Sequence, residues 1–203
     1  MSTFEESGLT FTFRDGWIVK RYDKDRYYKW VSGSGLKAVD FVVITPDGAV
    51  IFIEVKNYTV RYGDQPPAIL NRLVHDPAEL VDTVNQKMKD TLLGIDTFHR
   101  YLRRRWWYRA GLPLLRRLPP GAGGIRFWTY VYYALKEQPN HCGMVLWAEW
   151  EPQDGLLNAE TLQQLRNNLE QRLRQRLRWL TEQVHIVNRQ ANPYEAFLQV
   201  EKA

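Results

Sequence analysis

Two apolar runs separated by a short polar turn dominate the first third of the chain. Residues 41–45 and 49–53 are almost entirely apolar, and Pro46, Asp47 and Gly48 lie between them. Unbroken hydrophobicity is typical of strands covered on both faces, and a Pro-Asp-Gly turn between two such runs predicts an antiparallel hairpin. Pro46 and Asp47 suit the corners of a type I turn. Gly48 suits the left-handed conformation that closes such a loop with a bulge.

The length of this loop determines which residues lie opposite one another. A three-residue loop pairs Thr45 with Ala49, and counting along both strands then places Asp40 opposite Glu54. Residues directly opposite share a sheet face, and Lys56 shares that face because side chains alternate with period two. A two-residue turn would shift the pairing by one residue and place the two acids on opposite faces.

Two neighbouring carboxylates in an apolar hairpin need a compensating positive charge. One interpretation is a Mg²⁺ ion, for which Mn²⁺ can substitute, bound by the carboxylates of Asp40 and Glu54, the backbone carbonyl of Val55 and water. Such an ion lowers the pKa of bound water and polarises a phosphoryl oxygen, and Lys56 would hold the water or offset charge on the phosphate. The alternative is a structural ion pair between Lys56 and one of the acids, which is common for acid-x-Lys triplets on strands. Because Asp40 is placed across the hairpin from Glu54, we favour the metal site over the ion pair.

The residues around the hairpin resemble a known family. Residues 35–40 (GLKAVD) and 53–58 (IEVKNY) are similar to the core of the PD-(D/E)XK nuclease superfamily, and nearest to its nuclease-related domain (NERD) proteins. Asp40, Glu54 and Lys56 match the Asp, Glu and Lys of the family motif. The resemblance implies a restriction-endonuclease-like α/β fold, in which helices flank a mixed β-sheet. It also implies Mg²⁺-dependent hydrolysis of phosphodiester bonds, usually in DNA.

Other positions extend this comparison or depart from it. Val39 stands where the family has a Pro. Many members carry a Glu on a helix ahead of the hairpin, and Glu5 or Glu6 would correspond to it. Residues 3–6 (TFEE) predict a capping box, and Gly8 then limits the helix to one or two turns. The alternative is a solvated N-terminal segment.

The remaining strands are predicted from composition and alternation. Residues 9–13 and 17–22 flank a polar turn and predict a first hairpin. Residues 126–136 are rich in Tyr, Trp, Val and Thr and predict a strand, as do residues 143–150. Residues 185–188 predict a short closing strand.

Two long helices are predicted from apolar positions spaced by three and four. The first begins with Asp76 as its cap and Pro77 in its first position, and the second is capped by Asn158. The stripe of the first helix consists of Val81, Val84, Met88, Leu92, Ile95, His99 and Leu102. The stripe of the second helix consists of Leu162, Leu165, Leu169, Leu173, Leu177 and Leu180. The leucine stripe is interpreted as a core face, with a homodimer seam as the alternative.

The first long helix also carries polar candidates. His99 lies on the apolar stripe and is interpreted as a packed histidine rather than a ligand. Nuclease-related domains tend to carry a Gln early in this helix, but Gln86 projects from the side opposite the stripe. Asn85 and Lys89 lie nearer its edge and are the better candidates for an auxiliary polar role.

A segment after this helix combines arginines with aromatic residues. Its central residues are Arg103, Arg104, Arg105, Trp106, Trp107 and Arg109. Guanidinium groups bind phosphates and aromatic rings stack on unpaired bases, so the segment predicts a contact with nucleic acid. The same composition suits an anionic membrane surface. A structural alternative is that the arginines close a helix C-terminus while the tryptophans pack on the sheet. In each case the segment is a basic-aromatic insertion into the core fold.

Composition sets broader limits. The 203 residues suit a single domain, 1–203, and the 44% hydrophobic and 25% charged fractions are those of a globular protein. The one cysteine, Cys142, excludes an intramolecular disulfide and fits a reducing compartment. We find no secretory signal and no apolar run that would span a bilayer, so a cytoplasmic location is expected. The net charge of +5 favours a polyanionic partner.

The expected function is therefore a Mg²⁺-dependent endonuclease that cuts DNA. Two alternatives remain open. One is a nucleic-acid-binding module of the same fold that does not cut. The other is a membrane-associated or protein-interaction domain in which the charges of the hairpin form only an ion-pair cluster.

Overall fold

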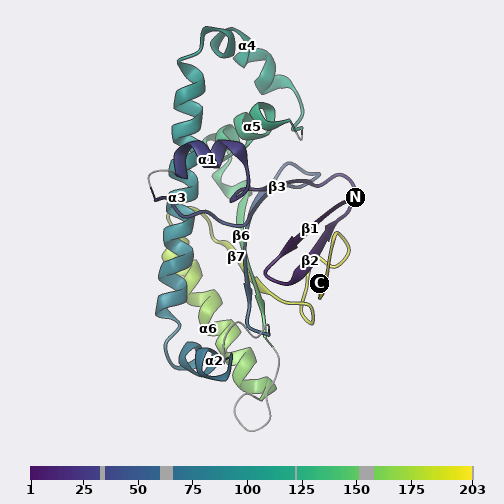
Figure 1. Ribbon diagram of the computed structural model, residues 1–203, viewed down its shortest axis with the longest axis vertical. Coiled ribbons are helices and arrows are strands. Elements are labelled where there is room, and N and C mark those ends of the chain that lie inside the picture. Colours follow the sequence, from purple (N-terminus) through teal and green to yellow (C-terminus); the bar gives the residue numbers. More distant parts are fainter. Residues whose placement is uncertain (33–34, 60–65, 122, 151–157, 203) are drawn as a thin grey trace. The chain divides into compact units, whose positions relative to one another are not determined.

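The computed structural model shows an α/β protein (Figure 1). It describes residues 1–32, 35–59, 66–121, 123–150 and 158–202. Within these ranges are a five-stranded mixed sheet in the order β3-β4-β5-β6-β7, a three-stranded antiparallel sheet in the order β1-β2-β8, and six α-helices. The predicted α/β class and mixed sheet are confirmed.

The chain divides into two compact units. The first contains Met1–Asp15, Ile53–Asn85 and Met144–Ala203, and the second contains Gly16–Phe52 and Gln86–Gly143. We describe each unit by itself. The assignment of residues 1–203 to a single domain stays a prediction.

The first unit contains the three-stranded sheet, whose strands are β1 (Ser2–Glu6), β2 (Leu9–Phe13) and β8 (Leu198–Lys202). The central strand β2 pairs antiparallel with both neighbours, as in Leu9 with Glu6 and with Lys202. Alternate residues of β2 are fully buried, which is the period-two pattern of a strand with one covered face. The ring of Phe11 packs edge-on against Trp147, with ring centroids 5.4 Å apart.

Two predictions for the N-terminal region are wrong. The segment around Glu5 and Glu6 is strand β1 and not the start of a helix, because it pairs along its whole length with β2. The predicted hairpin between residues 9–13 and 17–22 does not form. Its first half pairs with β1 and β8, while its second half, β3 (Ile18–Arg21), pairs with β4. Alternation identified both strands, but it carries no information on which strand each would pair with.

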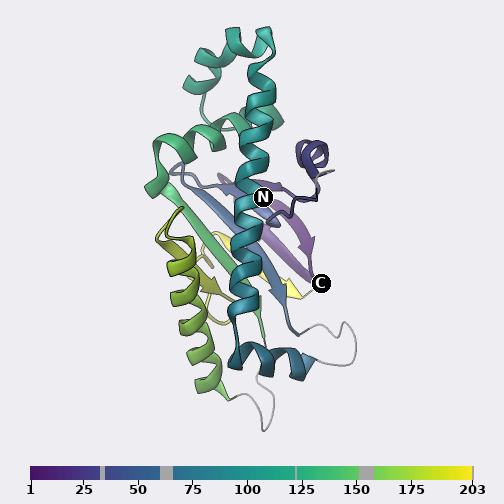
Figure 2. The ribbon, with the colours of Figure 1, turned by 90° about the vertical axis from the view of Figure 1, so that its left-hand side faces the viewer.

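The first unit also contains α2 (Pro66–His75), α6 (Ala159–Leu177), β7 (Gln183–Val187) and most of β6 (Cys142–Glu149). Helices α2 and α6 lie side by side in both ribbon views (Figures 1 and 2). Every residue of β6 is buried, including Glu149 at its end. The predicted strands at 143–150 and 185–188 are confirmed.

Helix α6 begins where the sequence predicts. The side chain of Asn158 accepts a hydrogen bond of 2.7 Å from the backbone N–H of Thr161, so it caps the helix. The leucines at 162, 165, 169, 173 and 177 are all buried within the chain. This confirms the core-face interpretation for these five leucines, whereas Leu180, the last predicted position, lies in the turn after the helix and is half-buried. A homodimer stays a prediction.

The second unit contains β3, α1 (Arg26–Ser32), β4 (Phe41–Ile44) and the start of β5 (Val50–Asn57). The loop between β4 and β5 has the predicted three residues. The backbone N–H of Thr45 donates to the carbonyl of Ala49, the N–H of Gly48 donates to the carbonyl of Thr45, and each of these hydrogen bonds is 2.9 Å long. Gly48 has a φ of +88°, as the predicted bulge requires.

Replacing Gly48 with alanine is expected to lower the free energy of unfolding by roughly 2 kcal/mol. The left-handed backbone costs a side chain about 1–2 kcal/mol, and a Cβ here would lie 2.6 Å from the hydroxyl oxygen of Tyr130. Gly35→Ala is the matched control, because Gly35 also has a positive φ but, apart from its chain neighbours, no described residue has an atom within 4 Å of a Cβ at that position. Urea unfolding should show a larger loss for Gly48→Ala; equal losses would contradict the steric argument.

Helix α5 (Gly124–Glu137) replaces the predicted strand at residues 126–136. Its buried residues include Phe127, Trp128, Val131 and Ala134. These positions recur at spacings of three and four, which is the pattern of a helix with one covered face. The prediction was wrong because aromatic and β-branched content was given more weight than spacing.

Helix α3 (Ala78–Arg103) and its cap agree with the prediction. The carboxylate of Asp76 accepts a hydrogen bond of 3.0 Å from the N–H of Ala78. His99 is buried, and its ring stacks on Tyr132 with centroids 3.5 Å apart. Within the described chain neither ring nitrogen of His99 has a hydrogen-bond partner. His99 is therefore a packed histidine, as predicted.

Acidification should destabilise the protein through His99. Burial lowers the pKa of His99 to about 4, the charge of Arg103 adds to this, and Asp96 acts in the opposite direction. The unfolded histidine has a pKa of about 6.5, so between these values the unfolded state binds a proton that the folded state does not. The free energy of unfolding should fall by roughly 3 kcal/mol as the pH drops through this range. The variant His99→Phe should lack this pH-dependent loss of stability. Urea unfolding of the wild type and of the variant, near neutral pH and near the folded-state pKa of His99, measures the difference. An equal loss in both proteins would contradict the assignment.

Candidate functional site

The residues predicted to form the metal site fall in two groups. Asp40 belongs to the second unit, and Glu54, Val55 and Lys56 belong to the first. Strands β4 and β5 are hydrogen-bonded neighbours in the five-stranded sheet. The pairing of Asp40 with Glu54 across this hairpin stays a prediction.

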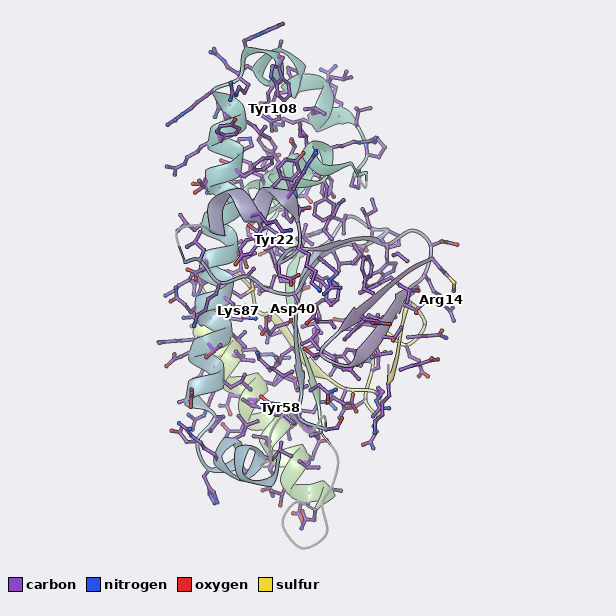
Figure 3. The ribbon with its side chains drawn as sticks, in the orientation of Figure 1. Arg14, Tyr22, Asp40, Tyr58, Lys87 and Tyr108 are labelled. Carbon is purple, nitrogen blue, oxygen red and sulfur yellow. The ribbon has the colours of Figure 1, made fainter. Side chains whose placement is uncertain are left out.

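Asp40 lies directly before β4 and its backbone is held from two sides. Its carbonyl accepts a hydrogen bond of 2.9 Å from the N–H of Tyr22. The preceding residue, Val39, donates its N–H to the hydroxyl of Thr91 at 3.1 Å. The Nζ atom of Lys87 on α3 lies 3.9 Å from the carboxylate of Asp40, and Figure 3 shows the two labelled residues beside each other. Helix α3 therefore supplies Asp40 with a neighbouring cation.

Sequence analysis did not identify Lys87. A signal was present in the sequence, because Lys87 and Thr91 are spaced by four residues and so lie on the same edge of the apolar stripe. A polar edge of this kind indicates side chains that can contact a neighbouring polar group. The polar candidates that were named instead do other things. Asn85 is buried and accepts a hydrogen bond of 3.2 Å from the indole of Trp179. Gln86 is exposed and donates to Asp90, and Lys89 is also exposed.

Glu54 is fully buried on β5. The Nζ atom of Lys56 lies 3.0 Å from its carboxylate, and the side chain of Lys56 is 29% exposed. The two residues share a face because they are two apart on a strand, and the buried Val55 lies between them in the sequence. The ion pair considered as the alternative interpretation is therefore present. Because a carboxylate has two oxygens, this ion pair does not prevent Glu54 from also binding a metal.

A pocket of about 340 Å³ adjoins Lys56 in the first unit. Its lining residues are Lys56, Tyr58, Arg72, Leu73, Asp76, Glu79, Leu80 and Thr83. Burial raises the pKa of Tyr58 well above its usual range, and the negative charge of Glu54 adds to the effect. Tyr58 is labelled in Figure 3. The pocket thus has a lysine and a neutral tyrosine close to a buried carboxylate.

A second buried carboxylate in the first unit provides a comparison. Glu149 on β6 is paired with Arg189, whose Nε atom lies 3.1 Å from one oxygen and whose backbone N–H donates to the other at 3.2 Å. One arginine residue therefore provides an ion pair to one oxygen of this carboxylate and a backbone hydrogen bond to the other. Glu149 is the natural control for a buried acid with a structural role.

The donor atoms available at the hairpin suit a hard divalent cation. Among the described residues there is no group of three or more His, Cys, Asp and Glu side chains that could hold a metal ion. The predicted ligands are two carboxylates, from Asp40 and Glu54, and the carbonyl oxygen of Val55. Oxygen ligands completed by water are the coordination that Mg²⁺ and Mn²⁺ prefer. The chemistry of these donors fits the predicted ion.

The arginine-aromatic segment forms the end of α3 and the start of α4 (Trp106–Arg117). Its four arginines, Arg103, Arg104, Arg105 and Arg109, are exposed. Trp106 is 79% exposed, so the interpretation in which both tryptophans pack on the sheet is wrong. The guanidinium of Arg105 lies over the ring of Tyr101, 5.0 Å from its centroid. Contact of this segment with nucleic acid stays a prediction.

Compared with protein-family models, curated proteins and solved structures, the chain shows no match. The resemblance to the PD-(D/E)XK superfamily therefore rests on residues 35–58. In the part of the chain that the structure describes, no helix has both the length and the hydrophobicity to cross a bilayer. The cytoplasmic location stays a prediction.

Proposed function

We propose that the protein is a metal-dependent nuclease that hydrolyses phosphodiester bonds in DNA. The observation that carries the proposal is the pair formed by Glu54 and Lys56. A fully buried carboxylate lies 3.0 Å from an ammonium group that also lines a pocket. A buried ion pair contributes little to stability compared with apolar residues of similar volume. Its presence in a core strand beside a pocket therefore favours a chemical role.

The second acid of the proposed site is Asp40. The three-residue loop sets Thr45 opposite Ala49, and continuing the same register would place Asp40 opposite Glu54. A mixed sheet that includes this hairpin supports the restriction-endonuclease-like fold as part of the proposal. Lys87, which lies beside Asp40, would balance the charge of that acid before a metal binds.

Each residue has a distinct role in the proposed reaction. Asp40, Glu54 and the carbonyl of Val55 would hold Mg²⁺ or Mn²⁺, which when bound lowers the pKa of its water and polarises a phosphoryl oxygen. Lys56 donates a hydrogen bond to the attacking water or to a phosphate oxygen and offsets the negative charge that develops there. Water adds across a P–O bond, so the products are a phosphomonoester and a free hydroxyl group.

A plasmid-cleavage assay tests this proposal. The purified protein should nick or linearise supercoiled DNA with Mg²⁺ or Mn²⁺, and EDTA should stop the reaction. Asp40→Asn and Glu54→Gln should each abolish cutting, because each removes a charged metal ligand. Glu149→Gln is the matched control for a buried acid and should cut like the wild type. A wild-type protein that binds DNA in a salt-dependent manner but cuts it with neither metal would be a non-catalytic binding module.

A further inference from the structure

Helix α4 exposes large apolar side chains along one side. Trp106 is 79% exposed, Leu114 is 63% exposed and Trp107 is 45% exposed, and Leu118, which follows the helix, is 37% exposed. With about 100° between successive residues, these four positions fall on one side of the helix. We call them the α4 apolar face.

An adjoining side of α4 fixes the orientation of this face. Tyr108 is fully buried, and its hydroxyl lies 2.8 Å from the hydroxyl of Thr129 on α5. Its ring also packs edge-on against His99, with centroids 5.9 Å apart. Tyr108 is labelled in Figure 3. Rolling the apolar face inward would break these contacts, so its exposure is a fixed property of the second unit.

The surroundings of this face are strongly basic. The chain has no Asp or Glu from Thr97 to Lys136, but it has eight arginines and one lysine there. The exposed guanidinium groups of Arg104, Arg109 and Arg117 make no hydrogen bond or ion pair with the described parts of the chain. Arg116 differs, because it pairs with Glu137 at 2.7 Å. Three more arginines have partners within the chain: Arg100 pairs with Asp96 at 2.8 Å, Arg105 donates to the hydroxyl of Tyr101, and Arg126 donates to the carbonyl of Pro119. The cations available to an external anion around the apolar face are therefore those of Arg104, Arg109 and Arg117.

We propose that α4 binds the surface of an anionic lipid bilayer. The helix would lie in the plane of the interface, with the α4 apolar face among the headgroups and the arginines on lipid phosphates. Tryptophan and arginine alone would suit a nucleic acid equally well. Exposed leucines stack poorly on bases but gain free energy on leaving water, so Leu114 and Leu118 favour the bilayer. This inference does not depend on the proposed nuclease activity.

Vesicle flotation of the full chain tests the inference. The protein should float with phosphatidylcholine vesicles that contain phosphatidylserine and not with phosphatidylcholine alone, and added salt should weaken binding. The double variant Leu114→Gln/Leu118→Gln retains every arginine and should bind about tenfold more weakly, given the free energy of burying a leucine side chain. Leu93→Gln is the matched control, because Leu93 is 52% exposed on α3 and lies outside the face. It should bind like the wild type.

A charge variant tests the proposed contact between the arginines and the lipid phosphates. Arg104→Gln/Arg109→Gln keeps both leucines and should lower affinity for anionic vesicles roughly thirtyfold, since each of the two cations contributes about 1 kcal/mol near such a surface. Circular dichroism establishes that each variant is folded. Unchanged vesicle binding by the folded leucine variant would overturn the inference. The inference would also be overturned if the wild-type protein did not bind anionic vesicles but bound single-stranded oligonucleotides with strong salt dependence. That result would support the nucleic-acid contact.

Discussion

Replacing Lys56 with methionine is expected to slow metal-dependent DNA cleavage by roughly a hundredfold to a thousandfold, the usual effect of removing one group that stabilises charge in the transition state. Lys56 lies beside the buried Glu54 carboxylate and lines the adjoining pocket. In the proposed site, its ammonium group would act on a phosphate held at the hairpin. Methionine has a similar length and flexibility but no charge.

Single-turnover cleavage of a labelled duplex, at a temperature well below the unfolding midpoint of every variant, measures this effect. Lys24→Met makes the same chemical change at an exposed position and should leave the rate unchanged. Arginine at position 56 should not restore the rate, because its planar guanidinium is not a compact point charge. Wild-type cleavage by Lys56→Met would show that Lys56 has no role in the chemistry.

The same substitution should also lower the free energy of unfolding, by about 3 kcal/mol or more. Without the ammonium, the Glu54 carboxylate stays buried without its neighbouring cation. The double variant Glu54→Gln/Lys56→Met removes the buried charge as well and should recover most of the loss. A double-mutant cycle measured by urea unfolding gives the coupling between the two residues.

A surface ion pair provides the control for this stability prediction. Arg72 and Glu79 are paired at 2.7 Å, but both side chains are mostly exposed. Arg72→Met should therefore cost less than about 1 kcal/mol. If Lys56→Met and Arg72→Met lowered the free energy of unfolding equally little, the argument that burial of Glu54 makes loss of its cation costly would be wrong.

Local signals predicted the parts of the fold that local interactions determine. The turn at Pro46, Asp47 and Gly48 and the caps at Asp76 and Asn158 involve residues close in sequence, so their chemistry could be read directly. The register that brings Thr45 to Ala49 followed from the loop length. The positions of Glu54 and Lys56 on one strand likewise followed from the apolar run at residues 49–53, which they directly follow.

Other features depend on partners distant in the sequence. Strand β1 looked like a helix start because Thr3 and Glu6 fit a capping box, yet pairing with β2 determines its structure. Strand β8 completes the same sheet from the other end of the chain, and no local pattern indicated it. Lys87 was missed for the same reason, since only the packing of α3 in the second unit brings it to Asp40. The exposure of Trp106 also required the structure, because tryptophan is usually largely buried.

Anomalous diffraction from a crystal soaked in Mn²⁺ tests the central claim most directly. The account predicts one manganese peak with the carboxylates of Asp40 and Glu54 and the carbonyl of Val55 as its protein ligands, and predicts that Asp40→Asn removes it. The absence of any peak at these atoms, with the Lys56 ammonium still bound to Glu54, would contradict the account.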